Sequence, residues 1–94
     1  VITNEVPTED NSLIMLSAES WCAPCRAFAP TYEQAAKEHD GDIKFYKVDI
    51  DEQPEVAEAY GVMTVPTVLR VKDGNVEPVT ERRPIPFMKY VESL

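Results

Sequence analysis

Two cysteines three positions apart stand where a buried-strand pattern gives way to a helical pattern, and this junction limits the possible folds more than any other feature. Residues 13–16 form a continuous apolar run, which is typical of a strand buried on both faces of a parallel sheet. Cys22 and Cys25 follow, and Pro24 between them suits the first turn of a helix, where its missing N–H is no loss. The sequence therefore predicts an α/β fold with the cysteine pair at the start of a helix.

The rest of the chain continues the alternation of strands and helices. The expected strands are residues 13–16, 43–50, 67–72 and 76–80, with Asp73-Gly74 as the hairpin turn before the last one. The expected helices run from Pro24 to about His39, from about residue 51 to Gly61, and from Pro86 to Leu94. Residues 1–12 are expected to be irregular. This order predicts a central mixed β-sheet flanked by helices.

Length and charge exclude several classes of protein. With 94 residues, the chain is expected to be one domain, residues 1–94. Its 17 acidic side chains against 9 Lys and Arg give a net charge of -8, so phosphate backbones and anionic lipid would repel it. No apolar run approaches the roughly 20 residues that span a bilayer, and no basic-then-apolar leader is present. We expect a cytoplasmic monomer with no nucleic-acid or membrane partner; because the chain begins at Val1, an upstream segment and secretion stay open.

The sequence offers few ligands for a metal. A structural zinc site uses about four Cys and His ligands, whereas this chain has two cysteines and one histidine. His39 lies fourteen residues beyond Cys25, near the expected helix end, and is expected to be a solvated terminal residue. An iron–sulfur centre shared between two chains is left open. We expect no metal, and no cofactor beyond a redox-active Cys22–Cys25 disulfide.

A disulfide between these cysteines can be structural or reversible. Closing a four-residue loop stabilises a fold by only about 2 kcal/mol, because so short a loop hardly restricts the unfolded chain, and a reversible dithiol explains the spacing better. At a helix N-terminus, unpaired N–H groups and the helix dipole favour the thiolate of Cys22. Cys22 would then attack a client disulfide, and Cys25 would release the reduced client from the mixed disulfide. Ala23 and Pro24 would stiffen the turn between the two sulfurs.

Two other positions are candidates for the same site. Trp21 adjoins the nucleophile, and a role at the site is favoured over an ordinary core position. Val65-Pro66 directly precedes a buried strand, a position that favours a cis bond more than most X-Pro pairs, although trans is the usual state.

These motifs resemble those of the thioredoxin family. The matching stretches, in register and without gaps from about residue 13 to residue 79, are Trp21-Cys22-Ala23-Pro24-Cys25-Arg26, Ala29-Pro30, Lys47-Val48-Asp49-Ile50-Asp51, Tyr60-Gly61-Val62, Val65-Pro66-Thr67 and Asp73-Gly74. The resemblance implies the thioredoxin fold with a shortened N-terminus, disulfide reductase activity and a cis Val65-Pro66 bond beside the sulfurs. It also implies that Trp21, Val65 and Pro66, with Ala23 and Pro24 beside them, bind an extended client peptide in strand fashion.

The chain departs from the family pattern beneath the cysteines. Leu16 stands where family members usually carry a buried aspartate that assists deprotonation of the second cysteine. Lys47, the usual neighbour of that aspartate, is retained without it. We hypothesise that Cys25 is activated more weakly, or through Glu19 or water.

Other departures concern the edge of the site. Ala23 stands where glycine is more usual, and Arg26 is a further candidate modulator. Arg82 and Arg83 replace the glycine expected after the last strand. A solvated turn is one interpretation of these arginines. The alternative is that they border the groove and select acidic clients or stabilise the Cys22 thiolate. The twelve residues before Leu13 are too few for both the customary first strand and first helix, so one of these is expected to be missing or reduced.

We expect a thiol–disulfide oxidoreductase that reduces client protein disulfides and is recharged by a thioredoxin-reductase-like donor. A disulfide isomerase or oxidant would use the same groove and cysteines. A non-catalytic interaction module with the thioredoxin fold is the alternative from another class, and replacing both cysteines by serine separates it from an enzyme. The direction of electron flow, the clients and the reductase are left open.

Overall fold

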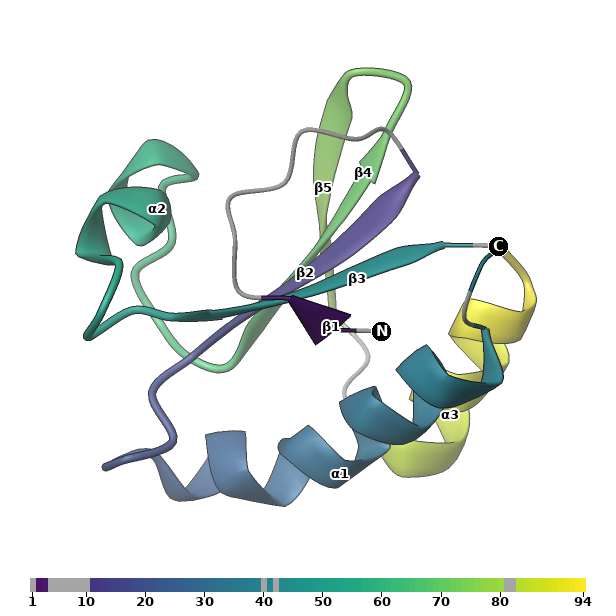
Figure 1. Cartoon of the computed structure of the whole chain (residues 1–94), viewed down its shortest axis with the longest axis horizontal. Helices are drawn as coiled ribbons and strands as arrows, with labels where there is room; N and C mark the ends of the chain where they lie inside the picture. The colour runs from purple at the N-terminus through teal and green to yellow at the C-terminus, as the bar shows by residue number, and fades with distance from the viewer. Residues whose placement is uncertain (1, 4–10, 40, 42, 81–82) are drawn as a thin grey trace.

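A five-stranded mixed sheet, in the order β1-β3-β2-β4-β5, forms the centre of the molecule (Figure 1). The computed structural model describes residues 2–3, 11–39, 41, 43–80 and 83–94. The strands are β1 (Ile2–Thr3), β2 (Ser12–Ser17), β3 (Lys44–Asp49), β4 (Thr67–Lys72) and β5 (Asn75–Val79). The helices are α1 (Ala23–Glu38), α2 (Pro54–Ala59) and α3 (Pro84–Glu92). β3 is parallel to β1 and β2, whereas β4 is antiparallel to β2 and β5, so the predicted mixed sheet is confirmed.

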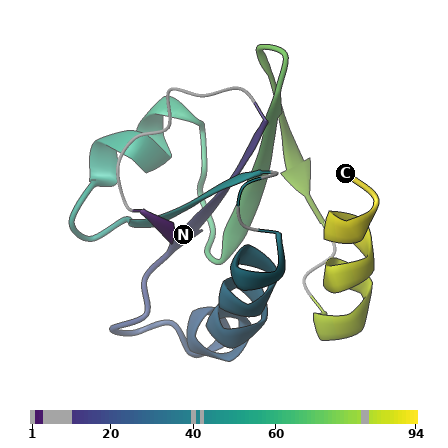
Figure 2. The same ribbon diagram turned by 45° about the vertical axis from the view of Figure 1, so that its right-hand side comes forward.

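Helices cover both faces of this sheet, with α1 and α3 on one side and α2 on the other (Figures 1 and 2). Successive residues of β2 alternate between the two layers. Leu13 and Met15 belong to a core cluster with side chains of α1 and α3, while Ile14 and Leu16 belong to a second cluster with Val56 of α2. All four β2 side chains are fully buried, so the prediction of a strand buried on both faces is confirmed.

Tyr32 of α1 lies at the centre of the larger core cluster. Its ring packs edge-on against Phe45 of β3, with ring centroids 5.6 Å apart. Its hydroxyl lies 2.7 Å from the carbonyl oxygen of Tyr46 and 2.9 Å from that of Leu13. Burial raises the pKa of the Tyr32 hydroxyl far above its ordinary value. A neutral, hydrogen-bonded hydroxyl therefore joins α1 to β2 and β3 from within the core.

The last helix begins two residues before its predicted start at Pro86. α3 begins at Pro84, with Arg83 as its N-cap residue. Pro84 and Pro86 both lie in the first turn, whose N–H groups have no partner within a helix, so neither proline costs a hydrogen bond. The Phe87 N–H makes the first bond of the helix, to the Arg83 carbonyl oxygen at 2.9 Å.

The N-terminal segment also differs from its prediction. Ile2–Thr3 form a strand rather than an irregular segment, and this strand pairs in parallel with β3, Ile2 opposite Phe45. The prediction that either the customary first strand or the first helix is missing or reduced is not decided, because a short first strand is present and residues 4–10 lie outside the described residues. The other elements agree with their predicted positions to within one or two residues, except that α2 begins only at Pro54. Among the described residues, β5 is an edge strand of the sheet, a position that tolerates the missing N–H of Pro78.

The topology brings three chain segments to one edge of the sheet. β2 and β3 are parallel, so their final residues Ser17 and Asp49 pair with each other. β4 is antiparallel to β2, so its first residue, Thr67, pairs with Leu16 near the same edge. The segments that follow β2 and β3 and the segment that precedes β4 therefore converge, and the first of them carries the cysteines.

Candidate active site

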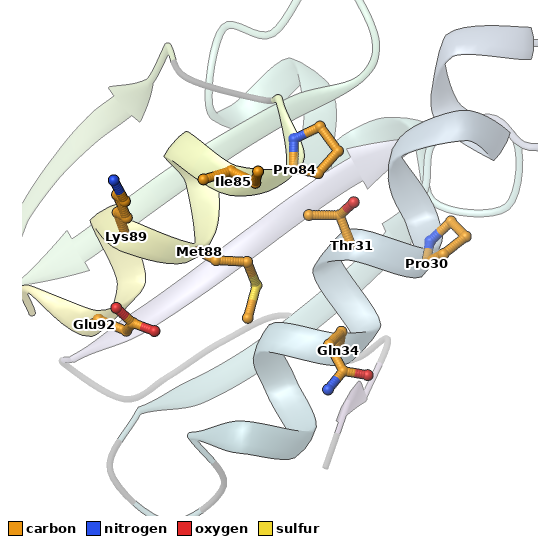
Figure 3. A pocket seen from close by; sticks show the side chains of 8 residues that line it. All are labelled: Pro30, Thr31, Gln34, Pro84, Ile85, Met88, Lys89 and Glu92. Atoms are coloured by element: carbon orange, nitrogen blue, oxygen red, sulfur yellow. The ribbon is translucent and has the colours of Figure 1, made fainter.

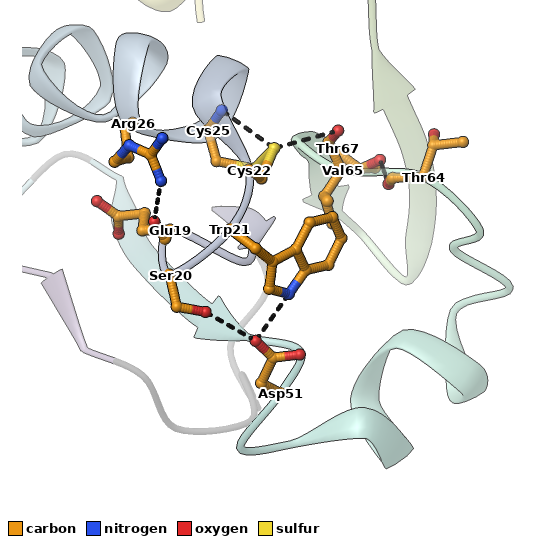
Figure 4. The surroundings of a disulfide bond; sticks show 10 residues. All are labelled: Glu19, Ser20, Trp21, Cys22, Cys25, Arg26, Asp51, Thr64, Val65 and Thr67. Carbon is orange, nitrogen blue, oxygen red and sulfur yellow. Dashed lines mark hydrogen bonds between the residues drawn. A yellow bond between two sulfur atoms is a disulfide. The ribbon is translucent and has the colours of Figure 1, made fainter.

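The turn after β2 delivers Cys22 to the start of α1. The Ala18 carbonyl oxygen accepts hydrogen bonds from the N–H groups of Trp21 at 3.1 Å and Cys22 at 2.8 Å. Cys22 is the N-cap residue of α1, with extended backbone (φ −101°, ψ 104°). Its Sγ accepts a hydrogen bond from the Cys25 N–H at 3.3 Å, so sulfur occupies the position that a capping oxygen usually takes (Figure 4). The predicted placement of Cys22 at the helix N-terminus is confirmed.

Cys22 and Cys25 form a disulfide bond, and their surroundings differ. Cys22 retains 6% of its surface exposed, whereas Cys25 is completely buried. Both pack with Ala18 in a small cluster that Ile50 and Val65 border. Of the two cysteines, Cys22 is therefore the one that keeps some surface open to solvent.

The segment before β4 lies directly beside the disulfide. The Val65-Pro66 peptide bond is cis, as the resemblance implies. Cys22 Sγ lies 3.8 Å from the carbonyl oxygen of Val65 (Figure 4). The Thr67 hydroxyl donates to the Thr64 carbonyl oxygen at 2.6 Å, which ties the ends of this turn together. Val65 and Pro66, forty residues away in the sequence, are thus part of the site.

Trp21 lies at the surface on the side of the site nearest β3. Its side chain is 61% exposed, and its indole Nε1–H donates to Asp51 Oδ2 at 2.9 Å. The Ser20 hydroxyl donates to the same carboxylate oxygen at 3.1 Å (Figure 4). The Asp51 N–H in turn bonds Asp49 Oδ1 at 2.8 Å. Sequence reasoning placed Asp51 in a matching stretch but missed this role, which two adjacent donors at residues 20 and 21 could have signalled.

Two depressions flank Val65. One, of about 330 Å³, is lined by Trp21, Ile50, Val62, Met63, Thr64 and Val65. The other, of about 570 Å³, is lined from α1 by Pro24, Ala27, Phe28 and Thr31, and from other segments by Val65, Pro66, Arg83 and Pro84. Ala23 is exposed at the first position of α1 and lines neither depression. The structure therefore gathers Trp21, Pro24, Val65 and Pro66 around the disulfide, as the sequence predicts for their positions.

The arrangement of a capped Cys-x-x-Cys helix beside a cis X-Pro turn can be compared with known proteins. The family model named thioredoxin matches residues 3–91. The chain belongs to the thioredoxin family. 

Individual relatives agree with this membership. The M-type chloroplastic thioredoxin of Pisum sativum is 50% identical over 54 residues, which are 57% of this chain and 31% of that protein. The thioredoxin of Listeria monocytogenes is 39% identical over 74 residues, 79% of this chain and 72% of its own length. The oxidized mitochondrial thioredoxin 3 of Saccharomyces cerevisiae has a TM-score of 0.77 at 28% identity, covering 93% of this chain and 81% of that one. The chain thus has the thioredoxin fold, but spans only about a third of the pea relative.

The departure from the family pattern beneath the cysteines has a structural counterpart. Leu16 is fully buried in the apolar cluster on the α2 side of the sheet, beside Ile14 and Val48. Lys47 has a different acidic partner, since its Nζ lies 2.5 Å from Glu19 Oε2. The main-chain carbonyl of Glu19 also accepts a hydrogen bond from Arg26 Nη1 at 2.7 Å. Three of the proposed modulators, Glu19, Arg26 and Lys47, therefore form one connected group at the turn before Cys22.

The two arginines after β5 have different outcomes. Arg82 lies outside the described residues. Arg83 is exposed, caps α3 and lines the larger depression together with Pro24 and Pro66. Its position fits the alternative that it borders the groove.

His39 is less solvated than its prediction states. It is the C-cap residue of α1 and only partly exposed, and its Nε2 is buried with no hydrogen-bond partner among the residues that the structure describes. Among the described residues, no group of three or more His, Cys, Asp or Glu side chains is placed to hold a metal ion. Within the same part of the chain, every helix is too short or too polar to cross a membrane.

Proposed function

We propose that this chain is a thiol–disulfide oxidoreductase that reduces disulfides in client proteins through the Cys22–Cys25 dithiol. The hydrogen bond from the Cys25 N–H to Cys22 Sγ carries this proposal. In the reduced protein the same N–H stabilises negative charge on Cys22, and the dipole of α1 adds to the effect. Because the thiolate is the attacking form of cysteine, this arrangement prepares Cys22 for nucleophilic attack.

The proposed cycle has two exchange steps. In the first, the Cys22 thiolate attacks one sulfur of the client disulfide, the client S–S bond breaks, and the departing client thiolate takes up a proton. In the second, Cys25 gives up its proton and attacks Cys22 Sγ, so that the bond between Cys22 and the client breaks and the second client thiolate leaves. Two electrons pass to the client, and the Cys22–Cys25 disulfide is the oxidised product.

The different burial of the two cysteines supports this division of roles. Cys22, with 6% of its surface exposed, is the sulfur that a client can reach, while the fully buried Cys25 is shielded from other disulfides. Because Cys25 is already bonded to Cys22 in the oxidised state, it needs no long movement to attack the mixed disulfide. We assign Cys22 as the nucleophile and Cys25 as the resolving cysteine.

Client binding is proposed for the surface around Val65. The Val65 carbonyl oxygen lies 3.8 Å from Cys22 Sγ, so a client strand that pairs with this backbone would hold its own sulfur beside Cys22. Trp21 and Pro66 would contact the residues on either side of the client cysteine. A dithiol donor of the thioredoxin-reductase type would recharge the protein, with no cofactor besides the cysteine pair. We propose that it works as a monomer in a reducing compartment such as the cytoplasm.

The redox potential of the cysteine pair tests the direction of electron flow. The protein is equilibrated in a dithiothreitol or glutathione series, and its dithiol fraction is measured. We expect a potential more reducing than the cytosolic glutathione pool. A clearly more oxidising value would instead support a disulfide isomerase or oxidant.

Variants of the two cysteines test the mechanism with insulin and dithiothreitol. Cys22→Ser is expected to abolish insulin reduction, whereas Cys25→Ser is expected to accumulate a mixed disulfide with the client. If a variant with both cysteines replaced by serine keeps the full biological effect, the protein is an interaction module and the proposed function is wrong.

A further inference from the structure

The three methionines of the chain lie in different surroundings. Met15 of β2 is completely buried in the core cluster beneath α1 and α3. Met88 of α3 is partly buried and lines a groove between α3 and α1 together with Thr31 and Gln34 (Figure 3). Met63, in the loop between α2 and β4, is 95% exposed. Because almost none of its surface is covered, its thioether sulfur is open to small molecules in solution.

Met63 belongs to the surface around the disulfide. Met63 and Thr64 line the smaller depression together with Trp21 and Val65. Trp21 directly precedes Cys22, and the Val65 carbonyl oxygen lies 3.8 Å from Cys22 Sγ. A client disulfide that reaches Cys22 would therefore bring its neighbouring residues to the depression that Met63 borders.

The main chain is anchored on both sides of Met63. The Val62 N–H donates to the Ala57 carbonyl oxygen of α2 at 2.9 Å, and Val62 packs against the core cluster on this face of the sheet. On the other side, the Thr64 carbonyl oxygen accepts a hydrogen bond from the Thr67 hydroxyl at 2.6 Å. The neighbours of Met63 thus fix its place beside the depression, while its side chain stays exposed to clients and reagents.

The described residues that line the smaller depression carry no ionisable side chain. They are Trp21, Ile50, Val62, Met63, Thr64 and Val65. An apolar client side chain gains free energy by leaving water against such a lining. A polar atom introduced at Met63 would lose part of its hydration when a client covers it, and this loss is unfavourable unless the client supplies a hydrogen bond. The affinity for clients therefore depends on whether the group at position 63 is apolar.

We propose that Met63 is a modification site at which a peroxide lowers the affinity of the protein for its clients. The thioether sulfur attacks one oxygen of hydrogen peroxide, and the O–O bond breaks. That oxygen stays on the sulfur as a sulfoxide, and the other leaves as water with both protons. The sulfur loses two electrons, and the peroxide gains them. The inference rests on the proposed function and adds a regulation of the same site.

Oxidation of Met63 is expected to change client binding rather than the exchange chemistry. The sulfoxide turns a flexible apolar side chain into a polar one, whereas Cys22 and Cys25 keep their surroundings. We expect KM for a protein client to rise about two- to fivefold, with kcat nearly unchanged. Methionine sulfoxide reductases, one for each epimer, remove the oxygen again, so the modification is reversible.

Peroxide treatment of the disulfide form tests whether Met63 is the site. In this form neither cysteine is a thiolate, so the cysteines are protected. The treated protein is digested, and peptide masses locate the added oxygen at each methionine or at Trp21. We expect Met63 to be oxidised at least about threefold faster than Met88, and Met15 to be protected as long as the protein is folded.

Kinetics after removal of the peroxide test the effect on clients. kcat and KM are measured for insulin reduction with dithiothreitol as the electron donor. Hydroxyethyl disulfide, which is too small to fill the depression, reports the cysteine chemistry alone and is expected to be reduced at an unchanged rate. Methionine sulfoxide reductases for both epimers are expected to restore KM for insulin.

Variants identify the methionine that is responsible, each compared with itself before and after peroxide. Met63→Leu keeps an apolar side chain of similar volume but forms no sulfoxide, so peroxide is expected to leave its KM unchanged. Met63→Gln has a polar group at all times, and its KM is expected to lie within about twofold of that of the oxidised wild type. Met88→Leu is the matched control, because it removes a methionine from the groove between α1 and α3, and it is expected to keep the full response to peroxide.

Each contrary result has a distinct meaning. An unchanged KM after oxidation at Met63, an equal rise of KM in Met63→Leu, or oxidation of Met88 ahead of Met63 overturns the regulation while leaving the oxidoreductase in place. If the untreated protein reduces neither insulin nor hydroxyethyl disulfide, the proposed function is wrong, and its regulation through Met63 is wrong with it.

Discussion

Lys47 on β3 forms an ion pair with Glu19, two residues beyond the end of β2, with 2.5 Å between Nζ and Oε2. The two side chains are 27% and 35% exposed, so the pair lies at the boundary between core and solvent. The resemblance to the family predicts an acidic neighbour for this lysine at position 16, whereas in the structure the acidic partner lies in the turn that leads to Cys22. The carboxylate beside Lys47 is therefore one that solvent can reach.

Replacement of Glu19 tests whether this carboxylate assists Cys25. Ala18, the neighbour of Glu19, packs in one cluster with Cys25, so the turn that carries Glu19 lies beside the buried cysteine. We expect Glu19→Gln to slow the attack of Cys25 on the mixed disulfide several-fold, while the free energy of unfolding changes by less than about 1 kcal/mol. Stopped-flow fluorescence of a trapped mixed disulfide measures the rate, with Glu33→Gln on the exposed side of α1 as control. Unchanged rates would assign the proton transfer to water alone.

A carboxylate restored at the Leu16 position is expected to destabilise the fold. Leu16 lies in an apolar cluster, and Lys47 is already paired with Glu19, so the new charge has no partner. We expect Leu16→Asp to lower the free energy of unfolding at pH 7 by about 3–5 kcal/mol. Burial would raise the pKa of the introduced carboxyl, so the loss should be smaller below its unfolded pKa of about 4. Urea titrations at pH 7 and pH 4 check this, with Leu16→Met expected to cost less than about 1.5 kcal/mol. If the Leu16→Asp variant were as stable as the wild type at pH 7, Lys47 would have left Glu19 and paired with the introduced aspartate.

Tyr32→Phe isolates the hydroxyl at the centre of the core. Two carbonyl oxygens lie within hydrogen-bond distance of it, so its removal is expected to cost about 1–2 kcal/mol without altering the rate of disulfide exchange. Denaturant unfolding and insulin reduction measure the two quantities. A parallel loss of activity would show that α1 shifts when this anchor is removed.

The same residue makes stability depend on pH under alkaline conditions. Because burial raises the pKa of Tyr32 above its ordinary 10.0, the unfolded chain loses this proton first. The contribution of the neutral hydroxyl is therefore complete below pH 10 and is lost progressively as the pH rises above it. We expect the difference in stability between wild type and Tyr32→Phe to shrink above pH 10, by about 1.4 kcal/mol for each pH unit. A constant difference up to pH 11 would contradict this.

Asp51 is expected to control the orientation of Trp21. Asp51→Ala removes the acceptor of both the indole and the Ser20 hydroxyl, whereas Asp51→Asn keeps an acceptor oxygen. We expect the alanine variant to raise KM for peptide substrates up to about fivefold with little change in kcat, and the asparagine variant to stay near wild type. Trp21 is the single tryptophan of the chain, so its fluorescence quenching by acrylamide reports the change directly. Identical quenching in all three proteins would contradict a positioning role.

Local patterns predicted the elements and the core of the site well, for physical reasons. The apolar run of β2 could only belong to a strand covered on both faces, and Cys22 had to follow it at a helix start. The start of α3 was harder to predict, because Pro84 and Pro86 satisfy the same rule for a first helical turn. The Glu19–Lys47 pair was also beyond local patterns, since it depends on the register of two parallel strands. The bond between Trp21 and Asp51 likewise joins residues that approach only in the folded chain.

The two prolines at the start of α3 have a consequence for how the site can diversify. Helix N-termini usually offer anions a set of main-chain N–H groups, which every sequence provides. Here Pro84 and Pro86 have no main-chain N–H, and the Phe87 N–H is already bonded to the Arg83 carbonyl oxygen. A negatively charged group at this rim would therefore have to be bound by a side chain rather than by main-chain N–H groups. A substitution at position 83 can therefore change the side chain at this rim while the prolines that begin α3 and both cysteines stay the same.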